Sequence, residues 1–375
     1  MLEKKLNERR ALGNLRSMSV AENRVDFLSN DYLGLACSQA LKENIDLAFL
    51  NLQETSKING STGSRLLSGN HKYIEAVEQK LALIFKSEAA LVFNSGYNAN
   101  LSILSCVPHK SDTIICDELI HASLIDGARL SYAKRLSFRH NDLEDLEKKL
   151  NHAEGEKFVV VESVYSMDGD TCPLDALIEL CEKYNAHIIV DEAHSTGLWG
   201  NNGSGMLCEQ NLQDKIFARI YTFGKGMGVH GACICGSQLL KDYLINFARP
   251  FIYTTALPLH SYVAIGSSFD YVEANPDYKN RLFNNIDFFK NLFVKYNSSN
   301  AHLLKPSNSA IQVIATSGNE HAKNIAEQLR ANQFEVRAIL SPTVKAGEER
   351  LRICLHAYNT EKEIEDFTRT LSQLL

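Results

Sequence analysis

Between residues 72 and 236 the chain alternates short apolar runs with stretches of helical periodicity, and this alternation most constrains its fold. Apolar runs that do not alternate with polar residues are typical of strands buried on both faces, and helices between them suit crossover connections. The expected strands are 89–93, 113–116, 135–138, 158–161, 187–190, 216–222 and 231–235. The expected helices are 72–86, one from about residue 98, 121–133, 142–152 and one that opens at Pro173. The pattern predicts an α/β fold with a mostly parallel sheet.

The segments on either side of this region show different patterns of apolar and polar residues. Residues 3–16 predict a charged amphipathic helix, and residues 27–35 predict a strand that runs into a turn. Beyond residue 258, the expected elements are a long helical stretch at 260–296, strands at 309–314, 334–339 and 350–355, and helices at 320–332 and 360–374. We therefore expect an N-terminal arm at 1–45, a large α/β domain at 46–258 and a small α+β domain at 259–375.

Composition excludes several classes of protein. The 375 residues carry a net charge of -6, which argues against nucleic acid or an anionic membrane as the main partner. The N-terminus has no apolar signal core and no apolar run could span a bilayer, so a cytoplasmic protein is expected. The nine cysteines show no Cys-x-x-Cys spacing and predict reduced thiols without a metal site.

Lys225 stands among glycines directly after an apolar strand, which is unusual for a solvated surface lysine. Such glycines let the backbone approach something flat or phosphorylated. Gly226, Gly228 and Gly231 match the dinucleotide-binding spacing, but the acidic residue that a ribose contact would need about twenty positions later is missing. Together with the stretch 191–194, Asp-Glu-Ala-His, the pattern predicts a pyridoxal phosphate site.

Pyridoxal phosphate needs an amine, an anion at the pyridine nitrogen, a donor to the phenolic oxygen, a flat group over the ring and a phosphate cradle. Lys225 offers the amine, because a lysine in a dry pocket loses its proton readily. Asp191 follows a strand at the edge where parallel sheets place their sites, and its charge would keep the ring nitrogen protonated. His194 can turn back to the phenolic oxygen, although such an Asp-x-x-His pair can also simply cap a loop.

The sequence also offers candidates for the phosphate cradle and for the flat group over the ring. Residues 95–98 lie between a strand and a helix, so backbone N–H groups and the positive helix end would meet the phosphate. Thr222 could add a hydroxyl. His121 opens a helix and could lie flat on the ring, or it could be a helix cap. Ser166 follows a strand end and is expected at the same edge of the sheet.

These stretches together resemble the α-oxoamine synthase family of fold-type I pyridoxal phosphate enzymes over nearly the whole chain. The matching stretches are 29–35, 121–124, 166–170, 191–197, 222–226 and 350–352. Family members condense an amino acid with an acyl-CoA and release CO2 and CoA. The stretches 222–226, 247–253 and 341–347 favour the member that joins L-alanine to a pimeloyl thioester, on CoA or acyl carrier protein, in biotin synthesis.

The resemblance implies a role for each matched residue. Lys225 would hold the cofactor covalently, Asp191 would contact the pyridine nitrogen, and His194 would contact the phenolic oxygen. His121 would stack on the ring and could donate a hydrogen bond to the thioester oxygen. The other cofactor contacts would be Gly96, Tyr97, Ser166 and Thr222, with Thr254 or Thr255 reaching the phosphate of the partner in a homodimer. The substrate contacts would be Arg352 at the amino acid carboxylate, Asn30 and Thr343 beside the substrate, and Arg16 at the acyl-CoA end. Arg350 is expected to face solvent.

Three alternatives remain open on the sequence alone. A relative that uses glycine with acetyl-CoA or serine with palmitoyl-CoA shares most of these positions. An aminotransferase on the same fold usually carries a tyrosine three residues after the aspartate, where this chain has His194. A non-catalytic regulatory subunit would typically lack Lys225.

Overall fold

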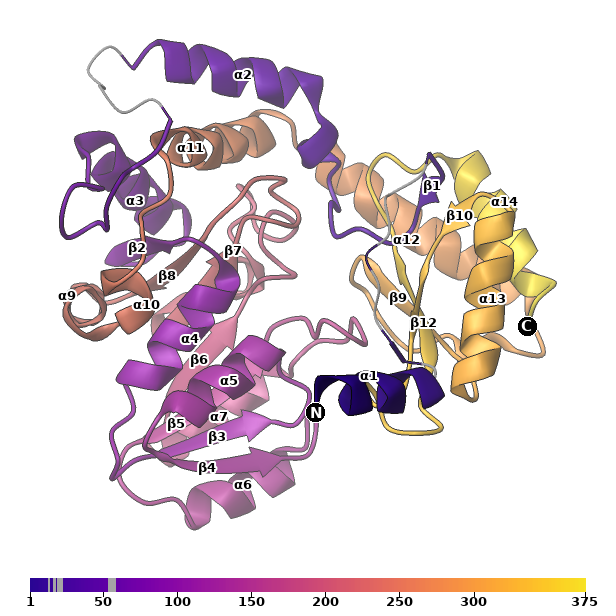
Figure 1. Ribbon diagram of the computed structural model, residues 1–375, viewed down its shortest axis with the longest axis horizontal. Coiled ribbons are helices and arrows are strands. Elements are labelled where there is room, and N and C mark those ends of the chain that lie inside the picture. Colours follow the sequence, from indigo (N-terminus) through magenta and orange to yellow (C-terminus); the bar gives the residue numbers. More distant parts are fainter. Residues whose placement is uncertain (13, 16–17, 19–22, 53–58) are drawn as a thin grey trace. The chain divides into compact units, whose positions relative to one another are not determined.

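The computed structural model describes residues 1–12, 14–15, 18, 23–52 and 59–375, which form two compact units (Figure 1). The larger unit holds residues 33–166 and 171–279, and the smaller holds residues 1–32, 167–170 and 280–375. These limits differ from the expected domain boundaries at 45 and 258. The N-terminal residues group with the C-terminal part because Val25 and Asp26 pair with Phe334 and Glu335.

A seven-stranded sheet forms the centre of the larger unit. Its strands are β2 (Ala89–Phe93), β3 (Thr113–Asp117), β4 (Lys134–Phe138), β5 (Lys157–Glu162), β6 (His187–Asp191), β7 (Ala218–Thr222) and β8 (Ala232–Gly236). Their order is β2-β8-β7-β6-β5-β3-β4, and only the pairs that include β8 are antiparallel within this sheet. The predicted mostly parallel sheet is therefore confirmed, and every expected strand of this region is present.

Helices connect and cover these strands. They are α2 (Gln39–Leu50), α3 (Lys72–Ile84), α4 (Gly96–Cys106), α5 (Ala122–Leu130), α6 (Leu143–Asn151), α7 (Leu174–Lys183), α8 (Met206–Glu209), α9 (Gln238–Phe247), α10 (Arg249–Ile252) and α11 (Leu259–Ala274), with short 3-10 helices η1 (Leu35–Cys37) and η2 (Gln213–Lys215). Helices α4 and α5 pack against each other, and α4 also packs against β7 and β8. Helix α11 packs against α2 and α3, which is why it belongs to this unit and not to the smaller one.

In its described residues, the smaller unit contains two sheets. Strands β1 (Val25–Asp26) and β10 (Phe334–Glu335) form a parallel pair, while β9 (Ile311–Ala315), β11 (Arg337–Ile339) and β12 (Arg350–Cys354) form an antiparallel sheet with β12 in the middle. The helices are α1 (Leu2–Ala11), η3 (Ala301–Leu303), α13 (Asn319–Ala331), α14 (Glu361–Ser372) and most of α12 (Asp277–Tyr296). Thr360 and Glu363 form a capping box at the start of α14.

Several expected elements have other limits. The expected strand at 27–35 is wrong: the chain turns there, because the Asp26 carboxylate accepts the N–H groups of Leu28 and Ser29. The long helix expected at 260–296 breaks before Pro276, which cannot donate a backbone hydrogen bond. Helix α1 ends at Ala11 and buries no side chain. Helices α2 and α9 were not expected.

Buried apolar side chains surround the sheet of the larger unit. Val159, Val160 and Ile189 are fully buried, as strands covered on both faces require. Cys233 and Cys235 are fully buried and have free thiols. Within the described ranges, the structure contains no helix long and apolar enough to cross a membrane.

Candidate active site

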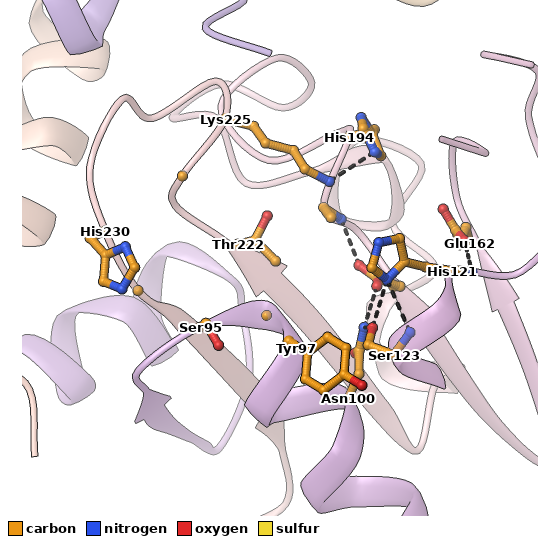
Figure 2. A pocket seen from close by; sticks show the side chains of 15 residues that line it. Ser95, Tyr97, Asn100, His121, Ser123, Glu162, His194, Thr222, Lys225 and His230 are labelled. Atoms are coloured by element: carbon orange, nitrogen blue, oxygen red, sulfur yellow. Dashed lines mark hydrogen bonds between the residues drawn. The ribbon is translucent and has the colours of Figure 1, made fainter. Parts of the chain in front are cut away.

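A cavity of about 220 Å³ opens where the parallel strands β5, β6 and β7 end (Figure 2). Carboxyl ends of parallel strands meet at one edge of the sheet, and this edge is the usual place for a ligand in such folds. The cavity is lined by Ser95, Gly96, Tyr97, Asn100, His121, Ser123, Glu162, Asp191, Ala193, His194, Thr222, Gly224, Lys225, His230 and Gly231. All of these residues belong to the larger unit.

Asp191, the last residue of β6, is held by two donors. Its Oδ1 accepts a hydrogen bond from the backbone N–H of Ala193 at 2.9 Å, and its Oδ2 accepts one from Asn100 Nδ2 at 2.8 Å. Asn100 Nδ2 also lies 2.9 Å from Ser123 Oγ. The side chain of Asp191 is buried, so these bonds fix its orientation in a water-poor site.

Lys225 and His194 meet across the cavity. Lys225 Nζ lies 2.8 Å from His194 Nε2, and Figure 2 shows the lysine side chain extended toward the imidazole. The lysine follows β7 in a tight turn, in which Gly228 N donates to the carbonyl of Lys225 at 2.9 Å. A Cβ on Gly228 would approach the backbone of Leu35 and Ala36 within 2.6 Å and 2.4 Å, and the residue has a φ of +64°. Glycine is therefore required where this turn closes.

His121 is the N-cap of α5, which was one of the two roles that the sequence suggested for it, the other being a group that lies flat on the ring. Its Nδ1 accepts a hydrogen bond from Ser123 N at 3.2 Å and lies 2.7 Å from Ser123 Oγ. Its own backbone N–H donates to Glu162 Oε1 at 2.5 Å. Burial lowers the pKa of His121, the charge of Lys225 lowers it further, and Asp191 only partly offsets these effects. The imidazole is therefore neutral near pH 7 and is available as a flat, uncharged group.

A second part of the cavity fits a phosphate. Ser95 caps α4 by accepting a hydrogen bond from Asn98 N, so the N-terminus of an eleven-residue helix faces this region. A Cβ on Gly96 would lie 2.5 Å from Thr222 Cγ2, so the backbone comes close to β7 only because residue 96 is glycine. Thr222 Oγ1 is buried and has no hydrogen-bond partner among the described residues. Figure 2 shows Thr222 between Lys225 and Ser95.

The cavity therefore contains most of the predicted cofactor residues, namely Gly96, Tyr97, His121, Asp191, His194, Thr222 and Lys225. Ser166 is buried but is not among the lining residues. Thr254 and Thr255 also lie outside the lining, and Asn94 Nδ2 contacts Thr254 Oγ1 at 3.4 Å and the Thr255 carbonyl at 2.9 Å. Arg16 lies outside the described residues.

The predicted substrate residues belong to the smaller unit. Arg352 is buried, and its Nη2 donates to Asn30 Oδ1 at 3.0 Å while its Nη1 contacts Cys354 Sγ at 2.9 Å. Thr343 lies in an exposed turn. The expectation that Arg350 faces solvent is wrong: only 3% of its side chain is exposed, and it forms an ion pair with Asp168. That partner comes from the separate segment 167–170, so the strand pattern could not show it.

Sequence reasoning missed four lining residues: Asn100, Ser123, Glu162 and His230. Two of them had a usable signal. Glu162 is a charged residue that ends a buried apolar strand, and Asn100 lies one helical turn after Gly96 and so faces the same way. Ser123 lies inside the matched stretch 121–124 but was given no role, and His230 had no signal, because a histidine in a glycine-rich turn is an ordinary residue.

Residues 22–371 match the family described as aminotransferase class I and II. This match covers nearly the whole chain, and the chain belongs to that family. The fold-type I fold and the resemblance expected from the sequence are thereby confirmed.

Individual relatives narrow the comparison. The chain is 36% identical over 371 residues to an 8-amino-7-oxononanoate synthase of Emericella nidulans, covering 94% of this chain and 89% of the relative. It is 37% identical over 372 residues to 8-amino-7-oxononanoate synthase 2 of Bacillus subtilis, covering 96% of this chain and 93% of the relative.

Solved structures of two kinds of enzyme have a fold similar to that of this chain. An 8-amino-7-oxononanoate synthase from Francisella tularensis is 31% identical, with a TM-score of 0.79 and coverage of 94% of this chain and 98% of that one. A serine palmitoyltransferase from S. paucimobilis, solved with PLP-myriocin bound, is 26% identical with a TM-score of 0.88. It covers 100% of this chain and 96% of its own.

Proposed function

We propose that this protein is a pyridoxal phosphate-dependent 8-amino-7-oxononanoate synthase. It would condense L-alanine with a pimeloyl thioester, on CoA or on acyl carrier protein, and release CO2 and the free thiol. The observation that carries this proposal is the arrangement of Lys225, His194 and Asp191 around one cavity, in a chain with 36% to 37% identity to named synthases.

The residues of the cavity suit several parts of the cofactor. The orphan hydroxyl of Thr222 and the N-terminus of α4 suit a phosphate, and Lys225 Nζ suits covalent attachment. Asp191 suits the pyridine nitrogen, because its carboxylate is fixed and buried. When bound, the cofactor would draw negative charge from the amino acid α-carbon into its ring.

The protein's own groups would manage binding and protons. Lys225 Nζ, once freed by the substrate amine, is the group placed to take the α-proton, and His194 Nε2 orients it. The neutral His121 imidazole would cover one face of the ring. It could also donate from Nε2 to the thioester oxygen, since its Nδ1 already accepts from Ser123 N.

Other expected roles extend this proposal. Arg352, oriented by Asn30, would bind the alanine carboxylate through two parallel hydrogen bonds. Thr254 and Thr255 would serve the phosphate of a second subunit, which requires a homodimer, and Ser166 would contribute to the cofactor site from the start of the next loop. Thr343 would lie beside the substrate, and Arg16 would meet the acyl-CoA end. The expected cytoplasmic location remains a prediction.

A serine palmitoyltransferase-like activity is the second candidate, because the backbone is more similar to that of the S. paucimobilis enzyme than to that of the F. tularensis synthase. Substrate choice depends on side chains more than on the backbone, and a few pocket contacts worth about 1–3 kcal/mol each decide it. The higher sequence identity to the synthases therefore favours alanine and the pimeloyl group.

The test is thiol release by the purified enzyme with pyridoxal phosphate. Alanine, glycine and serine are each paired with pimeloyl-, acetyl- and palmitoyl-CoA. Turnover that is strong only with alanine and pimeloyl-CoA supports the proposal. Preference for serine with palmitoyl-CoA would replace it with the second candidate, and amine transfer to a keto acid without thiol release would indicate an aminotransferase.

A further inference from the structure

Glu162 is a buried carboxyl group in the cavity wall to which the proposed function gives no task. It is the last residue of β5, and 1% of its surface is exposed. The sheet register pairs it directly with Asp191 of β6. Because neighbouring strands lie about 4.8 Å apart and paired residues in parallel strands share a face, two carboxyl groups stand side by side at the cavity.

The contacts of Glu162 lead to His121. Glu162 Oε1 accepts the backbone N–H of His121 at 2.5 Å, as Figure 2 shows, and the backbone of Ser166 donates to the same carboxyl group. The bonded peptide group is the one from which the His121 side chain extends at the N-cap of α5. Glu162 therefore fixes the backbone that sets the position of the imidazole.

The two carboxyl groups, Asp191 and Glu162, have different surroundings. Asp191 has a side-chain amide donor in Asn100 and a backbone donor in Ala193, so both of its carboxylate oxygens accept hydrogen bonds. Glu162 has two backbone donors, but burial and the neighbouring charge of Asp191 outweigh them and raise its pKa well above the usual value. Lys225 after β7 acts in the opposite direction.

The titratable neighbours of Glu162 are Asp191 on β6, Lys225 after β7, His121 before α5 and Tyr165 after β5. His121 is neutral near pH 7, and burial raises the pKa of Tyr165 and keeps its phenol protonated, so neither group adds a charge beside Glu162. Two adjacent buried carboxylates cannot both ionise at low cost.

We propose that Glu162 is a positioning residue held as a neutral carboxylic acid, which fixes His121 over the cavity without adding a second negative charge beside Asp191. Asp191 alone of the pair then carries the charge that faces the ring nitrogen. The role of His121 rests on the proposed function, whereas the protonation state of Glu162 does not.

The protonation state is tested on the cofactor-free protein by urea unfolding between pH 5.5 and 8. A carboxyl group that is neutral when folded and ionised when unfolded releases a proton on unfolding. The unfolding constant of the wild type should therefore rise with pH relative to that of Glu162→Gln, which has no such proton, by up to about tenfold per pH unit. A ratio that stays constant over this range would show an ionised Glu162 and overturn the proposal. Glu162→Met provides the same comparison if the glutamine variant does not fold.

The positioning role is tested on the holoenzyme with alanine and pimeloyl-CoA. Glu162→Gln keeps an oxygen that can accept the His121 N–H, so its kcat should stay within about threefold of the wild type. Glu162→Met loses this acceptor, and its kcat should fall about tenfold or more with little change in the KM for alanine. Equal activity of the methionine variant would overturn the positioning role. If no variant, nor the wild type, releases thiol, the proposed function fails while the unfolding result still decides the charge of Glu162.

Discussion

The cavity at the carboxyl edge of the large sheet and the buried arginines of β12 both hold charges away from water, but they do so differently. In the cavity, Asp191 is bonded by groups from the adjacent loop and from α4, close to where its own strand ends. On β12, Arg350 pairs with Asp168 and Arg352 with Asn30, residues about 180 and 320 positions away in sequence. The first arrangement suits chemistry on a fixed ligand. The second holds two buried guanidinium groups in place through partners that are distant in sequence.

The largest effect is expected at the cavity. Lys225→Ala should hold no cofactor covalently and should lose about a thousandfold or more of the turnover, because the attachment point and the proton acceptor are removed together. Borohydride reduction followed by peptide mapping of the wild type should place the label on Lys225. The variant should keep the wild-type circular dichroism spectrum. A label on another lysine would contradict the assignment.

Arg352→Gln should affect binding more than chemistry, which sharpens the contrast with Lys225. The lost charge-assisted bonds are worth about 1.5–3 kcal/mol, so the KM for alanine should rise about tenfold to a hundredfold. The KM for pimeloyl-CoA should change little. Steady-state kinetics with each substrate varied in turn would measure this, and an unchanged KM for alanine would remove Arg352 from the substrate site.

Asp168→Asn tests whether Arg350 has a structural role. The substitution leaves the buried guanidinium with only the half-exposed Glu348, 3.5 Å away, as a carboxylate partner, and should lower the free energy of unfolding by about 2 kcal/mol in urea denaturation. The double variant Asp168→Asn, Arg350→Met should recover part of that loss, because no buried charge then remains unpaired. A single-variant loss below about 0.5 kcal/mol would show that the pair contributes no more than a surface ion pair.

The smallest effect concerns pH. Burial lowers the pKa of His121 below its usual value of about 6.5, so the neutral imidazole of the folded protein persists as the pH falls through that value. The part of the kcat/KM profile that depends on His121 should therefore decline only below about pH 6.5. This part is measured by comparing the pH profiles of kcat/KM for the wild type and for His121→Asn. An acid limb above pH 7 that disappears in the variant would contradict this prediction.

Much of the large sheet could be predicted from sequence because each strand is a continuous apolar run, buried on both faces, and ends at a polar residue. Asp191, His194 and Lys225 could be placed together for the same reason: they follow neighbouring strands at one edge. The environment of Arg350 could not be predicted, because alternation along a strand says which face a residue takes and not what lies opposite. Glu162 was missed although its position at the end of an apolar run was visible.

The smaller unit is built from three separate segments of the chain, which limits how the protein could be divided or recombined with a relative. Its residues come from 1–32, 167–170 and 280–375, so the chain passes between the two units four times. A gene fragment that encodes 280–375 alone would lack the carboxylate of Asp168 and the strand that pairs with Phe334. The unit therefore cannot be moved to another protein as one continuous segment. A chimera between two relatives would have to exchange all three segments together.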